Sequence, residues 1–306
     1  MGTCPTATRP GGGPHPGGVG HDRGRGRRPV SDAAFDLDVA RARTHDGPLS
    51  LVVVADSTSF TDHLGPQLPS TPHLYPQVAA RHLAAALDRP VVPTVVARPG
   101  MTVRDAVRVV TKDQHVQYDV LAHADAVVLG VGSFDHAPIG VPAGVEVAAT
   151  YLRPTALRRR VRRALKAAYP VLVRATGGRV TRTAWPEFAR LYTELADHVR
   201  GLTWGRVPGV AVGPTSHRSA YYGHTHPTHA RDQARQRALA SELGFVAVDA
   251  WPHVVPHAAE LNVDGIHWPA AAHEAVGRAV ADALLPGLRG DGPLVGLPPA
   301  AAAALG

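Results

Sequence analysis

Five short apolar runs, separated by amphipathic stretches, constrain the fold of this chain more than any other feature. Each run is apolar along most of its length, which is typical of a strand buried on both sheet faces. The predicted strands are Leu49–Ala55, Val91–Ala97, Ala124–Val131, Val210–Gly213 and Phe245–Val248. The stretches with helical spacing are Pro76–Leu87, Thr102–Val110, Pro186–Val199, Thr228–Leu243 and Pro269–Leu285. This alternation predicts an α/β fold, in which helices cover both faces of a parallel sheet.

The segment between the third and fourth predicted strands has about 80 residues, far more than one crossover needs. We interpret residues 140–205, approximately, as a helical insertion over the carboxyl edge of the sheet, where open α/β sheets bind ligands. The whole domain is predicted to span residues 48–288. Residues 1–47 are rich in glycine and proline and lack the apolar core of a signal peptide, so we expect a disordered tail. Residues 289–306 are predicted to form a second disordered tail.

Positive charge is concentrated in one segment of the chain. The net charge is +7, but residues 147–186 contain ten arginines and lysines and no acidic residue. This segment therefore carries +10, which leaves −3 on the rest of the chain. It is interpreted either as a solvated helical face or as a site for phosphates or carboxylates. Nucleic acid is not an expected partner, because no aromatic residues interleave to stack bases and no known binding motif is present.

Other classes of protein are excluded by composition. Cys4 is the single cysteine, so neither an internal disulfide nor a cysteine-rich metal site can form. Apolar runs in the predicted domain, such as Leu51–Ala55, are no longer than five residues, whereas a membrane-spanning helix needs about 20. Without a membrane span or a signal peptide, a cytoplasmic protein is expected.

Two short segments have the residues of a serine nucleophile and its base. Ser57 follows the first strand, where its backbone amide and a helix dipole can stabilise an oxyanion. Asp264 and His267 stand three residues apart, just before the helix that Pro269 opens. That spacing allows the carboxylate to orient the ring while the other ring nitrogen reaches Ser57. The alternative is that Ser57 caps a helix and that His267 is a surface histidine with satisfied nitrogens.

These segments resemble the sequence blocks of the SGNH, or GDSL, hydrolase superfamily, whose fold is a flavodoxin-like three-layer α/β/α sandwich. The first block matches Ala55-Asp56-Ser57, with alanine in place of the leading glycine, and the last matches Asp264-Gly265-Ile266-His267. The glycine of the second block matches Gly100. The resemblance implies that Ser57 is the nucleophile, that His267 is the general base and then acid, and that Asp264 holds His267. It also implies that the Ser57 and Gly100 amides bind the oxyanion.

The third block departs from the superfamily pattern. It matches Gly132-Ser133-Phe134-Asp135, so Phe134 stands where the oxyanion asparagine belongs. A phenylalanine side chain donates no hydrogen bond, and losing such a donor reduces the rate of a serine hydrolase roughly 10²–10³-fold. Ser133 and the histidine-rich loop described below are candidate replacements. Asp135 is expected to bind hydroxyl groups of the substrate, or alternatively to cap the next helix.

Within this superfamily, the chain is most similar to the actinobacterial diglucosylglycerate octanoyltransferases, which acylate the sugar precursor of methylglucose lipopolysaccharides. The similarity extends from about Leu51 to Leu285. Besides the blocks above, it includes Val53–Ser57, Arg104-Asp105, Tyr151–Pro154, Leu157–Arg159 and Asn262–Trp268. It implies transfer of an octanoyl group from octanoyl-CoA to a glycosylglycerate hydroxyl. Acyl-CoA would be a co-substrate, and no bound cofactor is expected.

Further residues are candidates for substrate binding. Arg153 and Arg158 of the basic segment could hold the CoA phosphates or the glycerate carboxylate. His217 and His226, in the loop after the fourth strand, could contact substrate, but the alternative of an inert polar loop is favoured. The histidines of this loop are His217, His224, His226 and His229. We expect no metal site, because the loop contains no cysteine or glutamate and is too rich in glycine and proline to form a rigid cage.

Two other functions remain open from the sequence. A plain SGNH esterase or deacetylase would use the same triad but would release the free acid in water. A non-catalytic anion or metal binder could retain the fold without the reaction.

Overall fold

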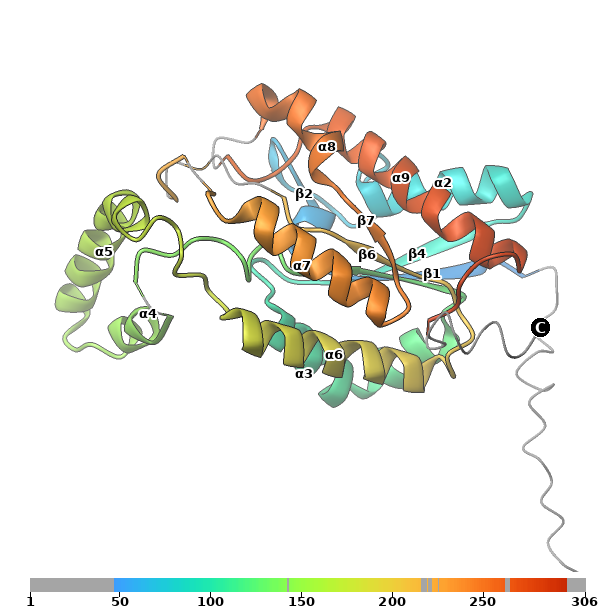
Figure 1. Cartoon of the computed structure of the whole chain (residues 1–306), viewed down its shortest axis with the longest axis horizontal. Coiled ribbons are helices and arrows are strands. Elements are labelled where there is room, and N and C mark those ends of the chain that lie inside the picture. Colours follow the sequence, from blue (N-terminus) through green and yellow to red (C-terminus); the bar gives the residue numbers. More distant parts are fainter. Residues whose placement is uncertain are drawn as a thin grey trace, which may run out of the picture. The chain divides into compact units, whose positions relative to one another are not determined.

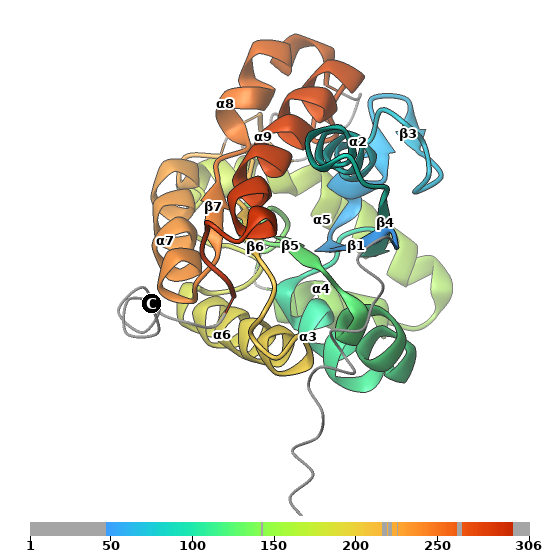
Figure 2. The ribbon, with the colours of Figure 1, turned by 90° about the vertical axis from the view of Figure 1, so that its right-hand side faces the viewer.

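The five predicted strands form one parallel sheet with the order β4-β1-β5-β6-β7 (Figure 2). The strands are β1 (Leu49–Ala55), β4 (Val91–Ala97), β5 (Ala126–Gly130), β6 (Gly209–Val212) and β7 (Val246–Val248). The computed structural model describes residues 47–295 except 142, 216–218, 220, 221, 225 and 262–264. In this flavodoxin-like order, the first strand lies between the second and the third, so that the chain winds to both faces of the sheet.

Helices cover both faces of the sheet, which confirms the predicted three-layer α/β/α sandwich (Figure 1). One face is covered by α3 (Val103–Lys112) and α6 (Trp185–Leu202), and the other by α2 (Tyr75–Leu87) and α9 (Ala270–Arg289). The side chains of β1 alternate between the two cores, because successive residues of a strand point to opposite faces. Two further α-helices of the layered part are α7 (His229–Glu242) and the four-residue α8 (Trp251–Val254). The short elements are η1 (Ser57–Ser59), β2 (Thr61–Asp62), β3 (Gly65–Pro66), η2 (His115–Val120), η3 (Leu121–His123) and η5 (Val255–Glu260).

The starts of two helices position the edge of the sheet that carries the predicted site. Thr102 caps α3 by accepting a hydrogen bond from the Asp105 amide, and the Asp105 carboxylate accepts one from the Thr102 amide. This reciprocal capping box fixes the turn that leads from β4 into α3. At the other helix, Pro269 is the N-cap of α9, directly after the buried Trp268.

The insertion after β5 is shorter than predicted and consists of α4 (Ala143–Thr150) and α5 (Thr155–Ala175). The predicted insertion, residues 140–205, wrongly included α6, whose apolar face packs in the core beside α3. Helices α4 and α5 project beyond one end of the sheet (Figure 1). A small cluster of Ile139, Tyr169 and Val173 anchors the C-terminal half of α5.

The ordered domain extends further toward the C-terminus than expected. Helix α9 continues to Arg289, and the fully buried Val295 donates a backbone hydrogen bond of 2.7 Å to the Val207 carbonyl. The tail predicted over residues 289–306 therefore begins too early. Residues 1–46 and 296–306, which contain most of the two predicted tails, lie outside the described residues. None of the helices described is both long and apolar enough to pass through a bilayer.

Candidate active site

A tight turn presents Ser57 at the carboxyl end of β1. Asp56 is the N-cap of η1, and its Oδ1 accepts hydrogen bonds from the Thr58 amide at 2.9 Å and the Thr58 hydroxyl at 2.7 Å. Asp56 is buried, and this burial raises the pKa of its carboxyl, although the Thr58 hydrogen bonds, the His267 charge and the Phe134 amide oppose the shift. The Asp56 contacts fix the backbone on which Ser57 stands.

The structure brings Ser57 and His267 together from opposite ends of the domain. His267 Nε2 lies 2.9 Å from Ser57 Oγ, which is the hydrogen-bonding distance that a serine nucleophile and its base would require. Next to His267, Trp268 pairs with Asp62 in a parallel β-bridge, which fixes this segment beside the chain that follows η1. Asp264, the predicted third member of the triad, lies outside the described residues. The predicted role of Asp264 therefore remains a prediction.

A buried aromatic cluster supports the His267 segment from behind. The ring centroid of Trp268 lies 5.2 Å from that of His273 and 6.0 Å from that of Tyr75. Burial lowers the pKa of His273 to about 3, so its ring is neutral at physiological pH. The Tyr75 amide lies 3.3 Å from His273 Nδ1, and His273 Nε2 lies 3.3 Å from the Thr61 carbonyl. A neutral ring satisfies both contacts by accepting at Nδ1 and donating from Nε2.

Phe134 stands at the position of the superfamily's oxyanion asparagine, and its ring lies beneath the guanidinium of Arg182. Gly100 has a φ of +63°, and a side chain there would have its Cβ 3.1 Å from Cε1 of Phe134. The Arg182 guanidinium carbon lies 4.1 Å from the centroid of the Phe134 ring. This cation–π contact adds a positive charge beside the Gly100 turn. Sequence reasoning did not single out Arg182 as a site residue, because nothing in its local pattern distinguishes it from the other arginines of the basic segment.

The other departure from the superfamily blocks, Ala55, has a local explanation, and the candidate donor Ser133 has a contact of its own. Ala55 pairs with Gly130 of β5, and a Cβ at Gly130 would lie 2.9 Å from that of Ala55. The glycine in β5 therefore leaves room for alanine in the first block. Ser133 Oγ accepts a hydrogen bond of 3.3 Å from the Thr215 amide, which links the loops that follow β5 and β6.

Asp135 is a structural carboxylate, which corrects the expectation that it binds substrate hydroxyls. Its side chain is fully buried. Oδ2 accepts a hydrogen bond from the Val103 amide at 2.9 Å, and Oδ1 accepts one from the Thr183 hydroxyl at 2.5 Å. Burial raises the pKa of Asp135 to about 7. The alternative role, capping a helix, is the one observed, but the helix is α3, which precedes Asp135 in the chain.

The remaining predicted binding residues lie on the insertion and in the loop after β6. Arg153 is exposed, and Arg158 donates a hydrogen bond of 3.4 Å to the Thr150 carbonyl at the end of α4. The ring of the buried His226 lies 5.4 Å from that of His229, whose Nε2 is 2.9 Å from the Pro214 carbonyl. His217 lies outside the described residues. In the part of the chain that the structure describes, no group of three or more histidine, cysteine or acidic residues could hold a metal ion.

Two curated proteins named diglucosylglycerate octanoyltransferase are similar to this chain along most of its length. The protein from Mycolicibacterium hassiacum is 31% identical over 243 residues, which cover 77% of this chain and 94% of that protein. The protein from Mycobacterium tuberculosis is 29% identical over 240 residues, which cover 77% of this chain and 92% of that protein. No protein-family model matches the chain.

Solved structures confirm the SGNH-type fold. A lipase from a goat rumen metagenome is similar with a TM-score of 0.51 and 11% identity, over 77% of this chain and 97% of that one. A lipase/acylhydrolase from Enterococcus faecalis has a TM-score of 0.50 and 12% identity, over 76% of this chain and 94% of that one. At such low identity, these likenesses show the fold alone.

Proposed function

The chain belongs to the diglucosylglycerate octanoyltransferase family, and we propose that it moves an octanoyl group from acyl-CoA to a hydroxyl of a glycosylglycerate. The protein is an enzyme with the SGNH-type fold. The observation that carries the proposal is the 2.9 Å contact between His267 Nε2 and Ser57 Oγ. It pairs a nucleophile with a base at the sheet edge where such folds bind ligands.

In the first half of the proposed reaction, Ser57 becomes acylated. Its Oγ attacks the thioester carbonyl carbon, and the hydroxyl proton passes to His267 Nε2. The bond from carbon to sulfur then breaks, and the CoA thiolate leaves with that proton as a free thiol. The products of this half-reaction are an octanoyl ester on Ser57 and CoA.

In the second half, the acceptor replaces CoA. His267 takes the proton of an acceptor hydroxyl while that oxygen attacks the ester carbonyl. The bond between the carbonyl carbon and Ser57 Oγ breaks, and His267 returns the proton to Ser57. Asp264 is proposed to hold the His267 ring, as the resemblance to the superfamily implies.

The oxyanion formed in both halves is proposed to bind the Ser57 and Gly100 amides. Two features support this assignment. The left-handed conformation of Gly100 suits the sharp turn after β4, and the capping box of α3 keeps the following residues in place. Phe134 contributes no donor, but the guanidinium over its ring adds positive charge beside this turn.

Product analysis tests the proposal directly. Wild type and Ser57→Ala would each be incubated with octanoyl-CoA, with and without diglucosylglycerate, and the products identified by mass spectrometry. We expect an octanoylated glycoside only when both the acceptor and Ser57 are present. Full transfer by the Ser57→Ala variant would reject the nucleophile.

The same experiment separates transfer from hydrolysis. Free octanoate released at the same rate with and without acceptor would make the protein an esterase or thioesterase that uses the same residues. A transferase instead has to favour the sugar hydroxyl over water at the acyl-enzyme.

A further inference from the structure

The proposed reaction leaves unused the largest concentration of charge in the molecule. Much of that charge lines a groove of about 630 Å³ between α4 and α5. Arg159, Arg162, Arg163 and Lys166 of α5 line it, beside the apolar Val147 and Leu165. We call this set of six residues the basic groove. Its cations come from successive turns of one helix, so their side chains are neighbours along it.

The three arginines of the basic groove concentrate positive charge along α5. Among the residues that the structure describes, Arg159, Arg162 and Arg163 form no ion pair. Arg159 and Arg163 are four residues apart, and like charges at this spacing destabilise a helix. A helix that needed only a solvated face would be more stable with acidic residues at some of these positions. The arrangement therefore favours an anionic ligand that relieves the repulsion.

We infer that the basic groove binds the phosphates at the nucleotide end of CoA, an inference that rests on the proposed function. CoA carries a pyrophosphate and a 3′-phosphate on one nucleotide, so several negative charges lie close together. Each guanidinium presents a planar set of donors that matches two phosphate oxygens. The apolar wall of Val147 and Leu165 can contact the uncharged part of the nucleotide.

The insertion contacts the loops at the sheet edge that carries Ser57, where acyl-CoA would have to bind. Its small core includes Ile139, which follows β5, and a Cβ at Gly223, in the loop after β6, would lie 3.0 Å from the Pro170 carbonyl of α5. Both loops leave the carboxyl edge of the sheet, the edge that also carries Ser57. The flexible pantetheine arm of CoA would connect the groove to the thioester.

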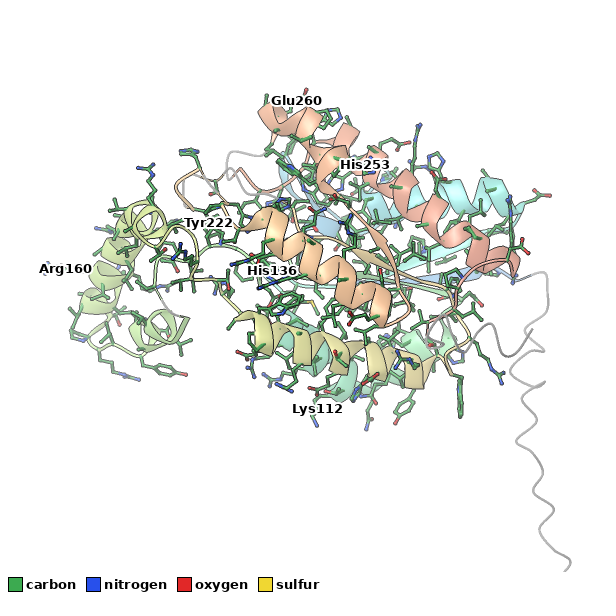
Figure 3. All side chains as sticks on the ribbon, viewed as in Figure 1. Lys112, His136, Arg160, Tyr222, His253 and Glu260 are labelled. Carbon is green, nitrogen blue, oxygen red and sulfur yellow. The ribbon has the colours of Figure 1, made fainter. Side chains whose placement is uncertain are left out.

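Calorimetric titration with CoA alone tests the groove without relying on catalysis. We expect the Kd for CoA to rise about 10- to 100-fold in the double variant Arg162→Ala/Arg163→Ala, because charge-assisted hydrogen bonds are lost. The matched control is Arg160→Ala/Arg179→Ala, which removes the same charge from the basic segment but not from the groove. Arg160 lies on the outer side of α5 (Figure 3). An equal loss of CoA affinity in the control, or no loss in the groove variant, would overturn the inference.

A second, kinetic arm separates failure of the groove from failure of the proposed function. Octanoyl-pantetheine has the same thioester as octanoyl-CoA but no nucleotide and no phosphates. We expect the groove variant to raise KM for octanoyl-CoA about 10-fold or more, and to change kcat/KM for octanoyl-pantetheine less than about 2-fold. If the wild type binds CoA through the groove but transfers no octanoyl group, the proposed function fails and the groove stands. If it transfers normally and the variant keeps both KM and Kd, the groove fails.

Vesicles of phosphatidylglycerol provide the last arm, because lipid headgroups also present phosphates. Val147 and Leu157 of the same insertion are exposed apolar residues, as a membrane-binding surface requires. We expect the groove variant to lose CoA affinity whether or not its binding to the vesicles changes. Loss of vesicle binding with unchanged CoA affinity would overturn it in favour of a lipid surface.

Discussion

Helices α5 and α6 follow one another in the chain but use arginine in opposite ways. In α6, Arg190 pairs with Glu194 at 3.1 Å and Arg200 pairs with Asp197 at 2.6 Å. Helix α5 has seven basic residues and no acidic residue. One face of α6 is buried in the core, whereas α5 contributes only Tyr169 and Val173 to a small separate cluster.

This contrast assigns different tasks to the two parts of the domain. The layered α/β part holds the proposed nucleophile and its base, and ion pairs occupy some of the arginines on its helices, as in α6. The insertion holds Arg159, Arg162 and Arg163, which form no ion pair with the described residues, on a lightly anchored helix, and this suits binding rather than chemistry. Changes in the layered part should therefore alter the chemical step with any donor, and changes in the insertion should alter the affinity for phosphorylated donors.

The largest expected effect is that of His267→Ala. Loss of the base should lower kcat about 10³- to 10⁶-fold, as for the histidine of other serine enzymes. The loss should be the same with octanoyl-CoA and with octanoyl-pantetheine, because His267 acts on Ser57 and not on the nucleotide. Steady-state kinetics with both donors measure this, and His198→Ala on the exposed face of α6 is the control. A residual activity within about 10-fold of wild type would break the assignment of chemistry to the layered part.

A smaller effect on kcat is expected when alanine replaces a glycine with positive φ in each part of the domain. Gly100 and Gly177 have φ values of +63° and +58°, so alanine is strained at both positions by about 1–2 kcal/mol. Only at Gly100 does the new Cβ meet a neighbour, Phe134, at 3.1 Å; at Gly177 nothing lies within 4 Å. We expect both variants to lower Tm, and only Gly100→Ala to lower kcat, by about 10- to 100-fold.

Gly177→Ala at the end of α5 is thus the matched control for Gly100→Ala. Thermal unfolding measures the strain, and kcat with octanoyl-pantetheine measures the effect on the reaction. If the two variants lost the same activity, the Gly100 turn would have no special part in the reaction.

Arg182→Ala should have a modest effect at the boundary between the two parts. Its guanidinium stacks on Phe134, and such contacts contribute about 0.5–1 kcal/mol at exposed sites. We therefore expect kcat to fall about 2- to 5-fold with either donor. Arg179→Ala, in the same segment, is the control. An effect confined to KM for octanoyl-CoA would instead assign Arg182 to donor binding.

The sequence predicted the layered part better than the insertion. Buried strands such as β1 are nearly continuous apolar runs, and the helices that cover them have apolar residues at helical spacing. The positions of the strands and helices in the sequence therefore followed from the pattern alone. The ends of elements were less certain: α9 extends past Leu285 to Arg289, and Val295 joins the core although its neighbours are rich in proline and glycine.

Within the site, residues in local motifs were predictable and residues defined by long-range packing were not. Ser57 and His267 stand in recognisable blocks, although their contact spans 210 positions. Asp135 was misassigned, because only the folded chain shows that its carboxylate caps α3 and bonds Thr183. The stacking of Arg182 on Phe134 depends on a fold-back of the insertion, in which Pro138 bridges to Thr181, and no local pattern signals it.

The last prediction concerns the pH dependence of the unfolding free energy, to which His273 adds little at neutral pH. Burial lowers the pKa of His273 to about 3, below its unfolded value of about 6.5. Above pH 6.5 the ring is neutral in both states and its contribution is fully present. As the pH falls from 6.5 toward 3, the unfolded chain takes up a proton that the folded chain does not, so the unfolding free energy falls by about 1.4 kcal/mol per pH unit.

Urea unfolding of wild type and His273→Asn between pH 7 and 4.5 measures this contribution. The slope of unfolding free energy against pH should differ between the two proteins by nearly the value for one proton, about 1.4 kcal/mol per pH unit. His136, whose pKa burial lowers to about 4, acts in the same direction in both proteins and cancels. Parallel curves for wild type and His273→Asn would contradict a neutral, buried His273.

The central claim, that Ser57 carries the octanoyl group between donor and acceptor, has a direct test. Wild-type protein would be mixed with octanoyl-CoA without acceptor, quenched rapidly, digested and examined by peptide mass spectrometry. We expect one octanoyl group on the peptide that contains Ser57, which disappears when diglucosylglycerate is added and reappears on the sugar. An octanoyl group on another residue, or transfer at the wild-type rate by Ser57→Ala, would contradict it.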